Sequence, residues 1–268
     1  MSEVIFYASD GRARALLEKH GLARADVLLE GPVGGVVSSE PGREVRLLRL
    51  AGGEERSGEE VLYLKRRGRE SWWRLLGMLV IYGRRPCSGP LRERALVRAL
   101  SAAGFATMEP VAWGERRVLG MPIAGFLLVK AVEGKSAADV YQKAAPGERS
   151  VLMRRLGELT GRLHRAGFLH PVRLKDLIVG PHDALVLIDR ESGKPWAGKF
   201  TIERGLASLA RATRRTLRDG HRIGPAEARA FVRGYAEGCG WNGSRAELAR
   251  ELMDAVRAEL TGDKRRRK

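Results

Sequence analysis

Cysteine is scarce in this sequence of 268 residues, where Cys87 and Cys239 are the only two. Two cysteines cannot build a disulfide framework, and they supply no cysteine cluster for a structural metal site. The fold must therefore be stabilised by a hydrophobic core, for which 44% hydrophobic residues are ample material. We expect a protein of a reducing compartment.

Long apolar runs are also absent. No stretch approaches the roughly 20 apolar residues of a membrane-spanning helix. The opening residues, MSEVIFYASDGRARALLEKHG, lack the basic segment and apolar core of a secretory signal. We expect a cytoplasmic location.

Acidic residues are in the minority, with 32 Asp and Glu against 49 Lys and Arg and a net charge of +17. This excess favours a polyanionic partner, such as nucleic acid, an anionic membrane surface or a phosphorylated sugar, or it is a solvated basic surface. No recognition-helix signature, aromatic stacking motif or zinc spacing is present, so we expect no specific nucleic-acid binding.

The pattern of apolar residues changes halfway along the chain. Short Val- and Leu-rich runs separated by turn residues predict an antiparallel sheet of three or four strands between residues 27 and 64, beginning with DVLLEG. A helix in PLRERALVRALSAAGF and two further strands follow, and after Gly134 the apolar residues recur at helical spacing. Strands followed by helices predict an α+β fold with two lobes.

The expected organisation has four parts. They are an N-terminal helical extension (1–26), an N-lobe (27–132), a C-lobe (133–262) and a basic tail (263–268). A cleft between two lobes is a common ligand site.

Three residues stand where phosphoryl transfer would need them, because this chemistry requires a cation on the phosphates and carboxylates for Mg²⁺. Lys65 ends the apolar strand VLYLK, and Asp189 closes the apolar strand ALVLID. Glu93 shares a helix face with Val97 and Leu100, so we expect it to point toward the sheet. Each has an ordinary alternative: a surface cation, a turn residue, and an acid that offsets the helix dipole.

Taken in chain order, several segments resemble the lipopolysaccharide kinase family. These segments are YLKRR, RERALVRALSAAGF, EPVAWGE, GFLLVKAVEG, LHRAGFLH and VLIDRES, within residues 27–238. The family consists of bacterial kinases with a protein-kinase-like fold that phosphorylate heptose or Kdo sugars of the lipopolysaccharide core. The resemblance implies ATP and Mg²⁺ as cofactors and a lipid-linked or phosphorylated glycan as substrate. It also implies Lys65 as the phosphate-binding lysine, Glu93 as its partner and Asp189 as the principal Mg²⁺ ligand.

The family pattern breaks in the loop HPVRLKDLIV, which starts at His170. The family has His, any residue, Asp, then four residues and Asn or His before the next strand. Without a gap, Val172 stands at the position of the base Asp and Leu177 at that of the metal ligand. With one residue deleted, Asp176 takes the metal-ligand position, and we favour this alignment because it leaves a polar residue at the strand entrance. In both alignments the base is absent, and Asp176 or His170 would have to replace it.

A missing base need not abolish turnover. A positioned base contributes about 10²–10⁴-fold, whereas positioning and electrostatics provide most of the remaining acceleration. We therefore expect an ATP-dependent phosphotransferase weakened at Val172 or, alternatively, a pseudokinase that binds nucleotide or a partner without transfer. Gly205 is a second departure, because the family usually has there an acid that braces the catalytic loop.

The segment KRRGRESWWRLLGMLVIYGRRP has an apolar, aromatic centre from Trp72 to Tyr82 with arginines on both sides. It is too short to span a bilayer. One interpretation is an interfacial segment with Trp72 and Trp73 at the lipid headgroups, which predicts peripheral association with the anionic inner face of the membrane. The other is a helix packed on the sheet.

Overall fold

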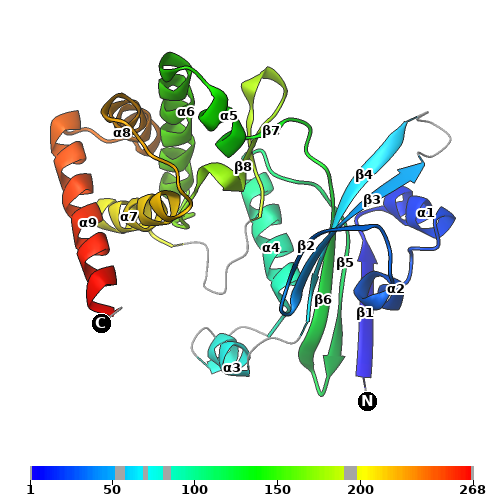
Figure 1. The fold of residues 1–268 in the computed structure, drawn as a ribbon. Helices are drawn as coiled ribbons and strands as arrows, with labels where there is room; N and C mark the ends of the chain where they lie inside the picture. The colour runs from blue at the N-terminus through cyan, green and yellow to red at the C-terminus, as the bar shows by residue number, and fades with distance from the viewer. Residues whose placement is uncertain (1, 52–57, 69–71, 81–85, 190–197, 267–268) are drawn as a thin grey trace. The chain divides into compact units, whose positions relative to one another are not determined.

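The structure is a computed structural model that describes residues 2–51, 58–68, 72–80, 86–189 and 198–266. The chain divides into two compact units. The first comprises Met1–Val132 and Asp189–Pro195, and the second Glu133–Ile188 and Trp196–Lys268. The first unit contains a large sheet and the second is mostly helical (Figure 1). The predicted α+β class is confirmed.

Six antiparallel strands form the sheet of the first unit, in the order β1-β5-β6-β4-β3-β2. The strands are β1 (Ser2–Ala8), β2 (Gly35–Glu40), β3 (Arg43–Ala51), β4 (Glu59–Arg67), β5 (Pro110–Val118) and β6 (Met121–Lys130). Strand β1 was not predicted, because its partner β5 lies about a hundred residues later in the chain. The expected helical extension therefore begins as an edge strand of the sheet.

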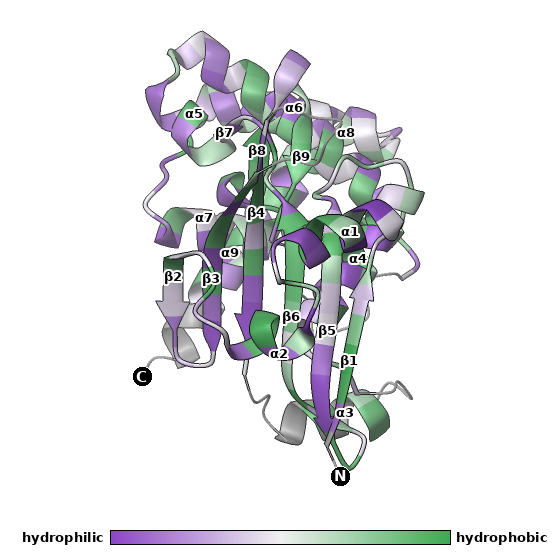
Figure 2. Ribbon diagram, turned by 90° about the vertical axis from the view of Figure 1, so that its right-hand side faces the viewer, coloured by the Kyte–Doolittle hydropathy of each residue, from purple (hydrophilic) through white to green (hydrophobic). Residues whose placement is uncertain are grey.

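Strand alternation assigns the side chains of β4 to two cores. Three helices cover the two faces: α1 (Gly11–Lys19), α2 (Ala25–Glu30) and α4 (Gly89–Ala102). Leu62 and Leu64 belong to the core that α1 and α2 cover, whereas Tyr63 packs into the core that α4 covers. Figure 1 shows α1 and α2 on the opposite face of the sheet from α4. Because Lys65 follows Leu64, its side chain points toward α4. Figure 2 shows β4 apolar in its middle and hydrophilic at its end.

The segment DVLLEG is helix α2, so its prediction as a strand was wrong. The adjacent residues Leu28 and Leu29 are both buried, whereas neighbours in a strand point to opposite faces. The guanidinium of Arg66 on β4 donates to the carbonyls of Val27, Leu28 and Gly31 at 3.2, 2.7 and 2.5 Å. The carbonyls of Val27 and Gly31 also accept from the backbone amides of Gly31 and Val33, at 2.9 and 2.8 Å, whereas the carbonyl of Leu28 lies in the last turn, where carbonyls lack intrahelical partners. A side chain far away in sequence thus stabilises α2.

In its described residues the second unit contains five α-helices, all after Gly134, where the sequence predicted helical spacing. They are α5 (Ala137–Lys143), α6 (Pro146–Arg165), α7 (Ile202–Arg218), α8 (Pro225–Cys239) and α9 (Arg245–Arg266). The three short strands are β7 (Lys135–Ser136), β8 (Leu177–Val179) and β9 (Leu185–Leu187). Helix α9 extends into the predicted basic tail, whose last two residues lie outside the described part of the chain.

None of the helices described is both long and apolar enough to cross a bilayer.

Helices α6 and α8 pack with their backbones in contact because glycines face each other. Four glycines share this role, two on each helix: Gly157, Gly161, Gly234 and Gly238. A Cβ on Gly157 would lie 2.2 Å from the carbonyl oxygen of Phe231, and one on Gly234 would lie 1.9 Å from that of Arg154. Each pair is spaced by four residues, which places it on one helix face. No larger residue fits at this crossing, which fixes α6 against α8.

Candidate functional site

Lys65 of β4 and Glu93 of α4 form a buried ion pair between the sheet and this helix. The Nζ atom of Lys65 donates to Oε1 of Glu93 at 2.5 Å, and the two side chains are 14% and 5% exposed. Strand alternation points Lys65 toward α4, and Glu93 lies on the buried face of that helix with Val97 and Leu100, as its spacing predicted. Two predicted residues from distant parts of the sequence thus meet.

Asp189 brings a second carboxylate to Lys65. Its Oδ1 lies 3.4 Å from Nζ of Lys65 and accepts a hydrogen bond from Nη2 of Arg43 at 2.7 Å. Its Oδ2 accepts no hydrogen bond from the described residues. The backbone of Asp189 is left-handed, with φ of 51°, which is uncommon for a residue with a Cβ although Asp tolerates it. Two cations hold one oxygen of Asp189, and the carboxylate stays accessible because its side chain is 39% exposed.

Burial and charge act in opposite directions on this cluster. Burial disfavours the ammonium of Lys65, but Glu93 and Asp189 outweigh it and hold the pKa of Lys65 above its ordinary value. Burial also disfavours the Asp189 carboxylate, but Lys65 and Arg43 hold the pKa of Asp189 below its ordinary value. Lys65 and Asp189 are therefore both charged at neutral pH.

A buried ion pair on β5 fixes the start of α4. Glu115 pairs with Arg117, and both residues are at most 5% exposed. Oε2 of Glu115 accepts a hydrogen bond from the amide of Ser88 at 2.9 Å, and Arg117 donates to the carbonyl of Pro86 at 3.0 Å. Ser88 is the N-cap of α4, so this pair determines where Glu93 lies. Neither charge was predicted from the sequence, although two charged residues at alternate positions of one strand are a signal of such a pair.

Asp176 belongs to the second unit and ends the 3₁₀ turn Leu174–Asp176, directly before β8. Its side chain is 5% exposed, and both of its oxygens accept hydrogen bonds from Arg173. Oδ1 accepts from Nη2 at 2.7 Å, and Oδ2 accepts from Nε at 3.0 Å and from the backbone amide at 3.1 Å. Such a two-point pair fixes the geometry of the loop and occupies the carboxylate.

Val172 is buried, with 6% of its surface exposed, so an apolar side chain stands at the position of the family's base. His170 is half-buried in the same loop. Within the described residues, no group of three or more His, Cys, Asp or Glu side chains is placed to hold a metal ion. The five predicted site residues thus fall into two sets: Lys65, Glu93 and Asp189 in the first unit, and His170 and Asp176 in the second.

Gly205 lies beneath the hydroxyl of Tyr235. A Cβ at this position would be 2.4 Å from that oxygen and 3.3 Å from Nδ1 of His164. The Tyr235 hydroxyl shares a hydrogen bond with Nδ1 of His164 at 2.9 Å, and burial raises the pKa of Tyr235. A histidine–tyrosine pair therefore occupies the space that an acid at residue 205 would need.

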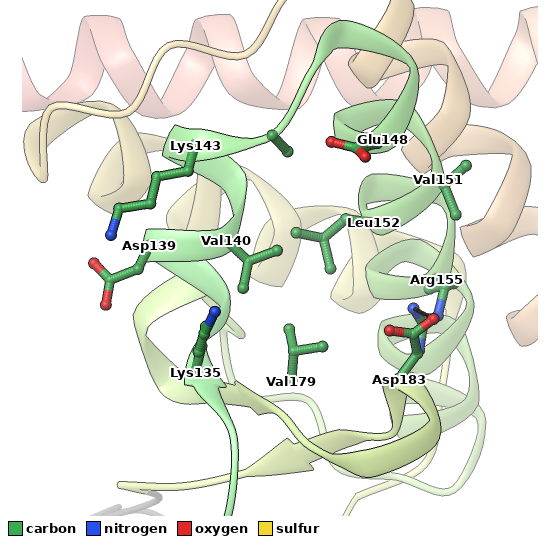
Figure 3. Close-up of a pocket in the computed structure, with 11 residues that line it drawn as sticks. Lys135, Asp139, Val140, Lys143, Glu148, Val151, Leu152, Arg155, Val179 and Asp183 are labelled. Carbon is green, nitrogen blue, oxygen red and sulfur yellow. Dashed lines mark ion pairs between the residues drawn. The ribbon is translucent and has the colours of Figure 1, made fainter.

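A cavity of about 500 Å³ lies in the second unit beside α5, α6 and the turn between β8 and β9 (Figure 3). Val140, Leu152 and Val179 give it an apolar floor, and charged side chains stand around them. Neither His170 nor Asp176 lines this cavity. It is therefore separate from the predicted site residues of this unit.

Comparison with known proteins finds one family model, "Lipopolysaccharide kinase (Kdo/WaaP) family", that matches residues 66–235. Among solved structures, "WaaP in complex with acyl carrier protein" is similar, with a TM-score of 0.63 and 16% sequence identity. The similarity covers 97% of this chain and 98% of that one, and at this identity it concerns the fold. No curated protein matches. The family match includes the loop at His170 and begins one residue after Lys65.

Proposed function

Because the chain belongs to the lipopolysaccharide kinase (Kdo/WaaP) family, we propose that it transfers the γ-phosphoryl group of ATP to a hydroxyl of a lipid-linked or phosphorylated glycan. The observation that carries this proposal is the cluster of Lys65 with Glu93 and Asp189. In kinases a strand lysine paired with a helix glutamate contacts the nucleotide phosphates, and an aspartate after a late strand binds Mg²⁺. The cluster has this composition, because Lys65 lies on strand β4, Glu93 lies on helix α4 and Asp189 follows strand β9.

The chemistry of Asp189 fits a magnesium ion. Mg²⁺ prefers oxygen ligands and is usually bound by one or two carboxylates together with substrate phosphates. The partly exposed Asp189 would hold it through Oδ2, while Arg43 and Lys65 keep Oδ1 in place. Bound Mg²⁺ supplies charge neutralisation on the transferred phosphoryl group. Glu93 orients the ammonium of Lys65, which would contact the phosphates.

Asp176 and His170 are assigned to the acceptor side, since Val172 has no proton-accepting atom. Asp176 would orient the acceptor hydroxyl or act as a second magnesium ligand once Arg173 releases it. Asp219 can take over the guanidinium, because Arg173 already lies 3.6 Å from its carboxylate. The absence of a preorganised base costs about 10²–10⁴-fold, so slow turnover is expected.

A second candidate function is nucleotide binding without transfer. Two observations favour it: the buried Val172 at the base position and the two-point pair between Arg173 and Asp176. The Lys65 cluster would serve both functions equally, so only a measurement of transfer separates them.

We further propose peripheral association with the inner membrane face, where a lipid-linked acceptor would be found. Helix α3 (Trp72–Val80) supports this, because Leu79 and Val80 are 51% and 77% exposed while Leu75 and Met78 are buried. Tyr82 and the side chains of Trp72 and Trp73, on which the sequence prediction also rests, lie outside the described residues. The net charge of +17 suits anionic lipid, and an acyl carrier protein is a partner to test because WaaP was solved with one.

The test measures binding and transfer separately. Calorimetric titration with Mg·ATP should show binding to the wild type and loss of binding in Lys65→Met. Lys130→Met is the matched control, because Lys130 is also a strand lysine paired with an acid but is 42% exposed. Lys65→Met with Glu93→Gln avoids leaving a buried carboxylate without its ammonium, in case the single variant does not fold.

Transfer is then measured with labelled ATP and purified lipopolysaccharide. Label in the glycolipid that depends on Asp189 supports the kinase. Binding without label in any acceptor supports the second candidate, and unchanged Mg·ATP affinity in the double variant would refute both.

A further inference from the structure

Arg215 is a half-buried guanidinium in the last turn of α7. Burial and the nearby charges of Arg173, Arg218 and Arg214 lower the pKa of Arg215, and Asp176 opposes them only weakly. Within the described part of the chain, Arg215 has no salt bridge or hydrogen bond from its side chain. The chain thus keeps a charged group partly out of water among like charges.

The acids of this region are engaged by other bases. These pairs are Asp176 with Arg173 at 2.7 Å, Asp219 with Lys175 at 3.1 Å and with Arg173 at 3.6 Å, and Glu259 with Arg214 at 3.0 Å. The bases outnumber the acids, so among the residues that the structure describes Arg215 and Arg218 are left without an ion pair.

The helix dipole alone does not account for this arrangement. Cations in the last turn of a helix interact favourably with its dipole, which suffices for the exposed Arg218. That effect does not require burial, whereas a charge that is taken from water needs a counter-charge. A bound anion would meet this need, and the planar fork of a guanidinium matches the oxygens of phosphate and carboxylate.

We propose that Arg215, together with Arg173 and Arg218, binds a phosphate or carboxylate group carried by the acceptor of the transfer reaction. This inference rests on the proposed function, because Arg173 also holds Asp176, which is assigned to the acceptor side. An anion that draws Arg173 toward itself would loosen the pair between Arg173 and Asp176. The acceptor class is then a sugar with an anionic substituent near the receiving hydroxyl.

Inorganic phosphate is the probe, titrated by calorimetry and by thermal shift. The wild type should bind it, and Arg215→Gln should weaken this binding about tenfold or more, since charged hydrogen bonds are lost. Arg229→Gln, which removes an exposed arginine of α8, is the matched control and should bind like the wild type. Equal phosphate affinity in Arg215→Gln and the wild type would overturn the proposal. If Arg215→Gln does not fold, Arg215→Lys keeps the charge without the fork and should give intermediate affinity.

Two further arms define the ligand. Glucose 6-phosphate and glucuronate should compete with phosphate in the wild type. Binding of phosphatidylglycerol vesicles that requires Arg215, without binding of any soluble anion, would overturn the acceptor assignment in favour of a lipid surface.

Mg·ATP affinity distinguishes this inference from the proposed function. Arg215→Gln should retain it and should raise the KM for glycolipid with a smaller effect on kcat. A wild type that binds phosphate through Arg215 but no Mg·ATP would refute the kinase and, with it, the assignment of the anion to an acceptor.

Discussion

The hydroxyl of Tyr235 and Nδ1 of His164 share a hydrogen bond of 2.9 Å, in a part of the second unit where neither residue is more than 1% exposed. The pair joins α6 to α8 and lies over Gly205 of α7, so three helices meet at one buried polar contact. A hydrogen-bonded histidine–tyrosine pair thus stands beside Gly205, the position at which the family usually carries an acid.

This contact predicts a steric penalty at Gly205. Gly205→Ala should lower the free energy of unfolding by about 1–3 kcal/mol, because the new Cβ would lie 2.4 Å from the Tyr235 hydroxyl. In the double variant Gly205→Ala with Tyr235→Phe the new methyl group gains room. The free energies of unfolding lost by the two single variants should therefore add up to more than the double variant loses. Urea denaturation measures both. Gly147→Ala is the control, since no atom lies within 4 Å of a Cβ there, and additive costs would contradict the steric contact.

Lys65 predicts a coupling with Glu93. Lys65→Met should lower the free energy of unfolding by about 3–5 kcal/mol, because a carboxylate whose side chain is 5% exposed loses its ammonium. Lys65→Met with Glu93→Met should recover part of this loss, since the buried charge is removed as well. Chemical denaturation of the three proteins measures the coupling. A double variant less stable than Lys65→Met would show that Glu93 is held by other groups.

Asp189 predicts a dependence of stability on pH. The folded state lowers the pKa of Asp189 below its ordinary value of 3.8, so the ionised form contributes stability that is present above this value. This contribution is lost as the pH falls through the lower folded pKa. The free energy of unfolding of the wild type, relative to Asp189→Asn, should be constant near neutral pH and fall below about pH 4. Since the side chain is 39% exposed, added salt should reduce the difference, and a gain on acidification would contradict the ion pairs.

Val172 predicts that the missing base cannot be restored by a single substitution. Val172→Asp would place a carboxylate at a position where Val172 is only 6% exposed. This burial should lower the free energy of unfolding by about 1–3 kcal/mol or more and leave phosphoryl transfer no faster. Val172→Ala controls for the lost packing. Melting temperatures and initial rates measure the two effects. A stable variant with about 10²-fold faster transfer would show that residue 172 reaches the acceptor.

Local patterns predicted the elements whose partners are nearby or periodic. Helical spacing in α4 predicted that Glu93 points toward the sheet, because that spacing sets the direction of a side chain. Its partnership with Lys65 came from the family resemblance, and strand alternation in β4 explains why Lys65 faces α4. The same patterns failed for α2 and β1, because distant parts of the chain stabilise them: Arg66 contacts α2, and β5 pairs with β1. The residues next to Arg66 in the sequence do not indicate what its side chain contacts. Its three hydrogen bonds to carbonyls of α2 form only after β4 has joined the sheet.

The candidate site shows the same limit. Asp189 and its contact with Lys65 followed from the ordered motifs, but Arg43 did not, because it lies 146 residues earlier in a strand with no signal of its own. Asp176 was placed correctly at the entrance of β8, yet its pairing with Arg173 was missed. A basic residue three positions before an acid fits many exposed loops, and the sequence carries no measure of burial there.

The neighbouring cations of β4 make this strand intolerant of odd changes in length. Arg66 serves α2 on one face of the sheet and Lys65 serves Glu93 on the other. Inserting or deleting one residue before them would exchange the faces, since side chains alternate strictly along a strand. The guanidinium would then meet Glu93, and the ammonium, with fewer donors, would face three carbonyls. Length variation among relatives at this strand should therefore occur in steps of two or be absorbed by the turns at its ends.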